Sequence, residues 1–427
     1  MLLVQLASYN TNLQGENGLP QDLVDWLSPT LQVSSFLSHY QQPADIVAVG
    51  FQELLPLHLG LSGLSTRVIE NRNAHILAQI EENALNKERY ALIAKIVNGG
   101  VALLVYARDA SVAHTACDVQ TSWTGTGPGY MSNKGAVGVR FRIPGEDGGA
   151  GETFTFVCAH LTAHAEKFAN RIADWHHIVG SLLFPTPAGP STTLYDTSHL
   201  FLLGDLNFRV VLPPEHPLKG APSGIMGQAL SSQSEREALK EYDQMLIERR
   251  DPASRAFVGL REGEFWNFKC SYKYNLGQVD KYSEKRTPSW TDRILYTTYT
   301  DSPDMPTKSA ITNLLYTSVP GYTTSDHKPI VSLLLLPAPP STISPSSTPP
   351  VLRLPAHYAP TPDPHATRKR YTGRVLDRLV GRVWWLLTIL GAGSALVGIF
   401  NFVLGLGAWG WWRSGGIRLG ADVGGAV

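Results

Sequence analysis

The chain has 427 residues, of which 43% are hydrophobic and 17% charged, a composition that is ordinary for a globular protein of one large domain or two smaller ones. Its 36 Lys and Arg residues balance its 36 Asp and Glu residues, which excludes a global bias towards nucleic acid. The three widely spaced cysteines form no C-x-x-C pair, so neither a zinc site nor a disulfide framework is indicated. Reduced cytosolic thiols and the absence of a signal peptide are the simplest expectations.

Four short apolar segments are typical of buried strands, and polar side chains follow each of them. The segments are residues 2–7, 45–50, 154–159 and 199–203, followed by Asn10, Glu53, His160 and the pair Asp205 and Asn207, respectively. Further strands are predicted at residues 137–143, 265–270, 293–298 and 330–336, and a hairpin at residues 90–97 and 101–106 with Asn98-Gly99-Gly100 as its turn. Helices are predicted at residues 21–40, 72–86, 163–184 and 234–250.

The stretch from Leu202 to Arg209 carries the most informative of these strand ends. Gly204 permits a sharp turn, and Asp205 and Asn207 lie two residues apart, so their side chains point to the same side of an extended backbone. A carboxylate and an amide in this arrangement can hold and deprotonate one water. A turn with an Asx cap is the better interpretation of these eight residues alone. The other polar strand ends favour the catalytic interpretation.

Two other segments have features of anion sites. Residues 124–136 contain four glycines and end in Asn133 and Lys134, but they lack the spacing of a Walker loop. Residues 269–293 interleave basic residues with Trp and Tyr, which favours a shaped basic pocket over a solvated charged face. The basic residues are Lys269, Lys273, Lys281, Lys285, Arg286 and Arg293.

The C-terminal quarter predicts a linker and a membrane anchor. Residues 337–364 include ten prolines and cannot form a core, so residues 337–382 are interpreted as a linker that ends in a basic juxtamembrane segment. Residues 383–409 contain no ionisable side chain, and about 20 such residues suffice to span a bilayer. A transmembrane helix over residues 383–412 with a short tail, 413–427, is preferred to a buried amphipathic helix.

Six stretches, in order along the chain, resemble the inositol polyphosphate 5-phosphatases, a branch of the endonuclease/exonuclease/phosphatase superfamily. They are Phe51-Gln52-Glu53-Leu54, Tyr130-Met131-Ser132-Asn133-Lys134-Gly135-Ala136, His160-Leu161-Thr162-Ala163, Gly204-Asp205-Leu206-Asn207-Phe208-Arg209, Pro288-Ser289-Trp290-Thr291-Asp292-Arg293-Ile294-Leu295 and Ser325-Asp326-His327-Lys328-Pro329. The resemblance implies a catalytic domain over residues 1–336 with an α/β fold, a four-layer α/β sandwich of two packed mixed sheets. The tail resembles fungal tail-anchored members that act on phosphatidylinositol 4,5-bisphosphate at the endoplasmic reticulum.

The resemblance also implies roles for individual residues. Glu53, Asn10 and Asp326 are expected to bind or position Mg²⁺. Asp205 is expected to activate the attacking water that Asn207 orients, while His160 and His327, the latter held by Asp292, contact the scissile phosphate. The substrate-binding residues are expected to be Tyr130, Asn133, Lys134, Lys269, Lys285 and Arg286. Two departures from the family pattern concern the 4-phosphate: Phe268 stands where many members have Tyr before the Lys, and the spacing between Lys and Arg near Lys285 is one residue shorter.

The expected protein is therefore a membrane-bound, tail-anchored enzyme with a monomeric cytosolic catalytic domain, a phosphoinositide lipid substrate and no nucleic-acid partner. Three alternatives remain at this point. They are a 5-phosphatase for soluble inositol polyphosphates, an abasic-site endonuclease of the same superfamily, and a non-enzymatic membrane tether.

Overall fold

The computed structural model describes residues 1–15, 27, 43–145, 149–186, 189–338, 348–391 and 395–413. The helix predicted over residues 21–40 lies outside these ranges except for residue 27.

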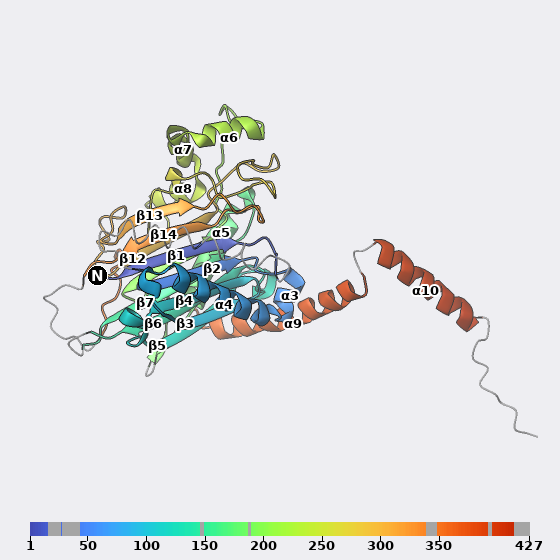
Figure 1. The fold of residues 1–427 in the computed structure, drawn as a ribbon, viewed down its shortest axis with the longest axis horizontal. Coiled ribbons are helices and arrows are strands. Elements are labelled where there is room, and N and C mark those ends of the chain that lie inside the picture. The colour runs from blue at the N-terminus through green and yellow to red at the C-terminus, as the bar shows by residue number, and fades with distance from the viewer. Residues whose placement is uncertain are drawn as a thin grey trace, which may run out of the picture.

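Two six-stranded mixed sheets form the centre of the fold (Figure 1). The first sheet has the strand order β13-β14-β1-β2-β4-β3, and its strands are β13 (Thr312–Ser318), β14 (Ile330–Leu335), β1 (Leu3–Asn10), β2 (Ile46–Gln52), β4 (Val101–Arg108) and β3 (Tyr90–Asn98). The second has the order β11-β12-β10-β7-β6-β5, and its strands are β11 (Arg261–Glu262), β12 (Asp292–Thr298), β10 (His199–Asp205), β7 (Glu152–His160), β6 (Gly135–Ile143) and β5 (Cys117–Gly125). The predicted hairpin of β3 and β4 is confirmed.

The sheets pack face to face, because their inner faces carry apolar residues such as Leu6, Ala48, Phe156 and Leu203. Gly50 lies where they approach most closely, since a Cβ there would be 2.8 Å from Cys158 Sγ. Helices pack on the outer faces and complete the predicted four layers. They include α4 (Ser65–Asn83), α5 (Phe168–Ser181) and α8 (Gln244–Arg250). The short helix α3 (Leu57–Ser62) follows β2, while α6 (Ser223–Ser231) and α7 (Gln233–Leu239) lie at one end of the sandwich (Figure 1). A small hairpin joins β8 (Phe184–Thr186) and β9 (Gly189–Thr192).

The topology brings the polar strand ends together. Each sheet has a central parallel pair, β1 with β2 and β7 with β10, so the carboxyl ends of each pair meet at one edge. The antiparallel neighbours β14, β12 and β6 begin at that edge, because β14 pairs with β1, β12 with β10 and β6 with β7. Residues at strand ends in β1, β2, β7 and β10 therefore lie near residues that precede β6, β12 and β14.

Three predicted elements differ from the structure for local reasons. The helix predicted over residues 163–184 ends at Ser181, because Phe184 precedes a proline and pairs in β8. The helix predicted over residues 234–250 is divided at Asp243, whose side chain accepts a hydrogen bond from Leu246 N over 2.9 Å and caps α8. Residues 265–270 do not form a strand, since Arg236 binds the carbonyl oxygens of Trp266 and Asn267.

The segment interpreted as a linker contacts the catalytic domain in the part that the structure describes. Residues 348–365 run along the outside of the second sheet as an extended strap. Leu352 N donates to Thr197 O over 2.9 Å, and Asp363 N donates to Gly180 O over 2.8 Å. The Leu352 side chain is only 8% exposed and belongs to the apolar cluster beneath α5. The many prolines suit this extended path and do not prevent packing.

We expect Leu352→Ala to lower the free energy of unfolding by about 2 kcal/mol, the lower end of the range for a buried Leu. Val351→Ala is the matched control, because the Val351 side chain is 57% exposed. Chemical denaturation of both full-length variants measures the difference. Equal stabilities of the two variants would contradict the docked position of the strap.

The predicted transmembrane helix is not found as one helix. Helix α9 (Ala366–Ile389) begins in the segment interpreted as a linker, and α10 (Ala395–Arg413) follows it at an angle (Figure 1). Within the described ranges, neither α10 nor any other helix combines the length and the apolarity needed to cross a bilayer.

Candidate active site

The predicted catalytic residues assemble at the edge where the strands end. Asp205 ends β10, and it lies in register with His160 on β7 and with Asp292 on β12. Across the sandwich, Asn10 at the end of β1 donates from Nδ2 to Asp205 Oδ2 over 2.9 Å. The same oxygen is 3.3 Å from His160 Nε2 and 3.9 Å from His327 Nε2. The Asp205 carboxylate is therefore the centre of a buried polar cluster.

His327 and Asp292 form the pair that the resemblance implies. His327 Nδ1 lies 2.9 Å from Asp292 Oδ2, which also accepts hydrogen bonds from Ser271 Oγ over 2.7 Å and Thr291 Oγ1 over 2.9 Å. Burial alone would lower the pKa of His327, but the carboxylates of Asp292 and Asp205 raise it to about 10. His327 is therefore an imidazolium at neutral pH, and its Nε2 faces Asp205.

The surroundings of Asp205 favour its charged form, and those of His160 favour its neutral form. Burial alone would raise the pKa of Asp205, but the positive charge of His327 and the bond to His160 hold it below its usual range. Burial and the Lys134 ammonium lower the pKa of His160, whose Nε2 is in contact with Lys134 Nζ. At neutral pH the cluster thus holds a carboxylate at Asp205 and a neutral imidazole at His160.

Glu53 supplies the accessible carboxylate of the site. Its side chain is 31% exposed, and Oε1 lies 3.8 Å from both Lys134 Nζ and His160 Nε2. Glu53 and Asn207 both adopt left-handed backbone conformations, with φ of 49° and 58°. Non-glycine residues in this conformation are strained and are concentrated at functional sites. The loops after β2 and β10 are thus held in the conformations that point these residues into the cluster.

The donor set fits a divalent cation. Glu53, Asn10 and Asp205 bring side-chain oxygens to the mouth of the cluster, and such hard oxygens are the ligands that Mg²⁺ and Ca²⁺ prefer. Asp292 Oδ1 is buried and has no hydrogen-bond partner within the described ranges. Asp205, Asp292 and His327 also offer ligand atoms that all lie within 4.8 Å of one another.

Two predicted residues are engaged differently from the expectation. The Asn207 side chain is buried, donating to Leu161 O over 3.1 Å and accepting from Arg209, so its amide is held by protein groups at both ends. Its backbone N–H donates to Asp205 Oδ1 over 3.1 Å, which fixes the carboxylate. The Asp326 carboxylate is paired with the Lys273 ammonium and is not in contact with Glu53 or Asn10 in the part of the chain that the structure describes.

The predicted substrate-binding residues do not form one group. Lys134 lies in the catalytic cluster, and Asn133 beside it has a buried Oδ1 without a partner among the described residues. The Tyr130 ring stacks on His177 at 5.3 Å between ring centroids and lies away from the cluster. Lys285 and Arg286 line a cavity of about 270 Å³ next to the cluster, together with Arg209, Lys219 and Tyr272. The predicted basic pocket therefore exists around Lys285 and Arg286.

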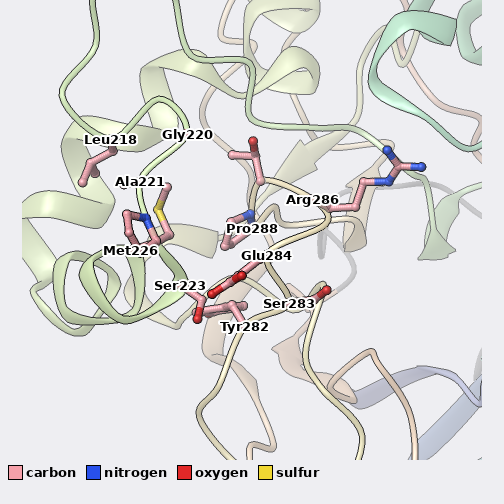
Figure 2. Close-up of a pocket in the computed structure, with 12 residues that line it drawn as sticks. Leu218, Gly220, Ala221, Ser223, Met226, Tyr282, Ser283, Glu284, Arg286 and Pro288 are labelled. Carbon is pink, nitrogen blue, oxygen red and sulfur yellow. The ribbon is translucent and has the colours of Figure 1, made fainter.

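A second cavity, of about 290 Å³, lies beyond Arg286 and is drawn in Figure 2. Leu218, Ala221 and Met226 line one side of it, and Arg286 extends away from these side chains towards the first cavity. Arg286 thus lies between the two cavities, since it lines both of them.

Phe268 and Lys269 contact groups outside the two cavities. Phe268 is buried and packs on Tyr316 in the core, and Lys269 is paired with Asp280 over 2.7 Å, so neither lines a cavity of the site. The Tyr272 ring instead lies tilted against the His327 ring with centroids 4.5 Å apart, and Lys273 contacts Asp326.

Arg209 lies beside the catalytic cluster, although no sequence pattern assigns it a role. Its guanidinium lies 4.4 Å from the centre of the Tyr272 ring and binds Asn207, and its side chain lines the basic cavity. A cation invariably charged at neutral pH next to the catalytic cluster suits a phosphate ligand. Its position four residues after Asp205 was the available signal.

Comparisons with known proteins place the chain in a family. Residues 7–333 match the endonuclease/exonuclease/phosphatase family 2, and the chain belongs to that family. Within it, the chain is similar to Synaptojanin-2 of Rattus norvegicus, with 29% identity over 67% of this chain and 18% of that protein. It is also similar to the type II inositol 1,4,5-trisphosphate 5-phosphatase of Mus musculus, with 30% identity over 73% of this chain and 28% of that protein.

The chain thus spans less than a third of the length of these relatives. Among solved structures, it resembles the inositol polyphosphate 5-phosphatase domain of SPsynaptojanin, crystallised with inositol (1,4)-bisphosphate and calcium. The TM-score is 0.59 at 25% identity, and the match covers 78% of this chain and 83% of that domain.

Proposed function

We propose that this protein is a Mg²⁺-dependent phosphoinositide 5-phosphatase that converts phosphatidylinositol 4,5-bisphosphate into phosphatidylinositol 4-phosphate. The observation that carries the proposal is the contact of Asp205 with His160, Asn10 and His327 at the mouth formed by Glu53. The relatives named above, whose names include inositol phosphate 5-phosphatases, support the substrate class.

The residues of the site suit direct hydrolysis of a phosphate monoester. The substrate is a dianion that repels nucleophiles, so its charge must be neutralised and a water held in line with the leaving oxygen. The His327 imidazolium and Lys134 supply positive charge, while ionised Asp205 accepts a hydrogen bond from the water and orients it. A Mg²⁺ ion held by Glu53, with Asn10 close by, would supply further charge neutralisation. Arg209, Lys285 and Arg286 would bind a second phosphate in the adjacent cavity.

We further propose that the substrate is a lipid and that the C-terminal region meets the membrane. The end of α9 and the part of α10 whose side chains the structure describes expose large apolar side chains, including Trp384, Leu386, Ile389, Phe400 and Leu404. Six basic residues precede them in α9, of which Arg368 and Arg382 are exposed. An exposed Lys or Arg near an anionic bilayer surface adds about 1 kcal/mol of attraction. A catalytic domain on the cytosolic side of the endoplasmic reticulum agrees with this arrangement.

An assay of phosphate release tests the function. We expect the full-length protein to release the 5-phosphate from phosphatidylinositol 4,5-bisphosphate in vesicles, to lose this activity with EDTA and to regain it with Mg²⁺. Soluble inositol 1,4,5-trisphosphate is the parallel substrate, and a higher kcat/KM for it would contradict the lipid preference but not the 5-phosphatase function. Release of the 4-phosphate, or activity that survives EDTA, would contradict the mechanism.

A further inference from the structure

Helix α9 packs on two segments that lead to the catalytic cluster, although the proposed reaction gives it no role. Its first two-thirds lie against the loop of residues 126–134 and against α3, and its end leaves the body of the protein (Figure 1). That loop ends in Lys134, and α3 begins four residues after Glu53. Lys134 and Glu53 are the two residues whose charged groups meet at 3.8 Å beside His160.

On the loop side, the contact is a buried hydrogen bond to the backbone. The Asp377 side chain is 3% exposed and accepts from Ser132 N over 3.0 Å to Oδ1 and 3.3 Å to Oδ2. One turn earlier, a Cβ at Gly373 would lie 1.9 Å from Tyr130 O, so the helix backbone touches the loop directly. Because Ser132 is two residues before Lys134, this bond limits where the Lys134 side chain can start.

On the α3 side, the contact also involves backbone groups. Arg378 Nη1 donates to Leu61 O over 2.8 Å, and a Cβ at Gly381 would lie 2.4 Å from Ser62 N. The Trp384 and His58 rings follow, with centroids 5.8 Å apart. One helix therefore holds both segments at a fixed separation. The close backbone approach requires glycine at positions 373 and 381, because a Cβ there would clash.

We propose that α9 is a positioning element of the catalytic centre, in which Asp377 fixes the Ser132 peptide and so places Lys134 against His160. This inference rests on the proposed function, because its effect is on the rate of that reaction. A helix that only covers an apolar surface would not need a buried carboxylate aimed at a loop peptide, since an unpaired buried charge is strongly destabilising. It follows that the C-terminal region is part of the catalytic unit.

The test compares Asp377→Ala with Val375→Ala in the full-length protein. Val375 is on α9 but 57% exposed, so it is the matched control. We expect Asp377→Ala to lower kcat on soluble inositol 1,4,5-trisphosphate about tenfold with little change in KM, since misplacement by a fraction of an ångström has effects of this order. We expect hydrogen exchange of the residue 126–134 amides to quicken in Asp377→Ala and to stay unchanged in Val375→Ala.

A double-variant cycle separates positioning from general destabilisation. If Asp377 acts through Lys134, then Asp377→Ala should cause almost no further loss of kcat in a Lys134→Met background. Full additivity of the two losses would overturn the inference, as would a wild-type kcat in Asp377→Ala. If Asp377→Ala does not fold, Gly373→Ala takes its place, with Gly405→Ala as control because a Cβ there would meet nothing within 4 Å.

The proposed function and this inference fail in different ways. A wild-type protein without phosphatase activity on either substrate would overturn both. An active wild-type protein whose loop exchanges faster in Asp377→Ala but whose kcat is unchanged would overturn the inference alone.

Discussion

Asp205→Asn is expected to lower kcat/KM for 5-phosphate release by about a thousandfold, within the range observed when a general base is removed. The Asp205 carboxylate is the group that the cluster keeps ionised, and its Oδ2 contacts Asn10 and His160 at 2.9 Å and 3.3 Å. An amide of the same shape cannot accept a proton from the attacking water. It also leaves the positive charge of His327 without one of its carboxylate neighbours.

The measurement is steady-state kinetics of the full-length variant beside its thermal unfolding midpoint. Asp118→Asn is the matched control, because Asp118 is a solvent-exposed carboxylate paired with Arg142 on an outer strand. We expect the control to retain wild-type kinetics. A folded Asp205→Asn variant with a loss smaller than about tenfold would show that another group activates the water.

The positions of the central catalytic residues were predictable because local patterns encode them. Apolar runs mark buried strands, and a polar residue directly after such a run must lie at a sheet edge. Asn10, His160 and Asp205 follow from this rule. That they meet around one carboxylate depends on which strands are parallel neighbours, and local sequence does not contain that information. The resemblance to a family supplied it.

The pairing of Tyr272 and Lys273 with the catalytic cluster was missed because the segment has no regular pattern. Residues 268–290 form isolated bridges between short extended pieces, such as that of Tyr272 with Ser289 and His327. Without a helical or strand period, the sequence does not show which of Lys269 and Lys273 lies next to the cluster. Only the contact with His327 distinguishes Lys273 from Lys269.

Amino-acid composition alone also could not predict that the C-terminal region docks on the catalytic domain. Prolines, basic residues and a long apolar run predicted a linker and a membrane span. The docking depends on Gly373 and Gly381, which allow close backbone contact, and on Asp377, the one acidic residue in α9. Their role in docking can be recognised only when it is known that they lie against the segments that contain Tyr130 and Leu61.

Asp292→Asn should shift the alkaline limit of activity to lower pH. In the wild-type protein, the carboxylates of Asp292 and Asp205 raise the pKa of His327 to about 10, so the imidazolium persists throughout the neutral range. A raised pKa of a base means that its protonated form is lost only as the pH rises through that value. Without the charge of Asp292, burial opposes protonation, and the His327 pKa should fall towards its ordinary value of about 6.5.

The expected loss of kcat/KM at pH 8 is about thirtyfold, because a group with a pKa near 6.5 is only about 3% protonated at that pH. The loss should be much smaller at pH 6, where the imidazolium is largely restored. Ser271→Ala is the matched control, since Ser271 Oγ also donates to Asp292 Oδ2, over 2.7 Å, but carries no charge. We expect this variant to keep the wild-type alkaline limit. If the pH profiles of Asp292→Asn and the wild-type protein have the same alkaline limit, His327 does not act as the imidazolium.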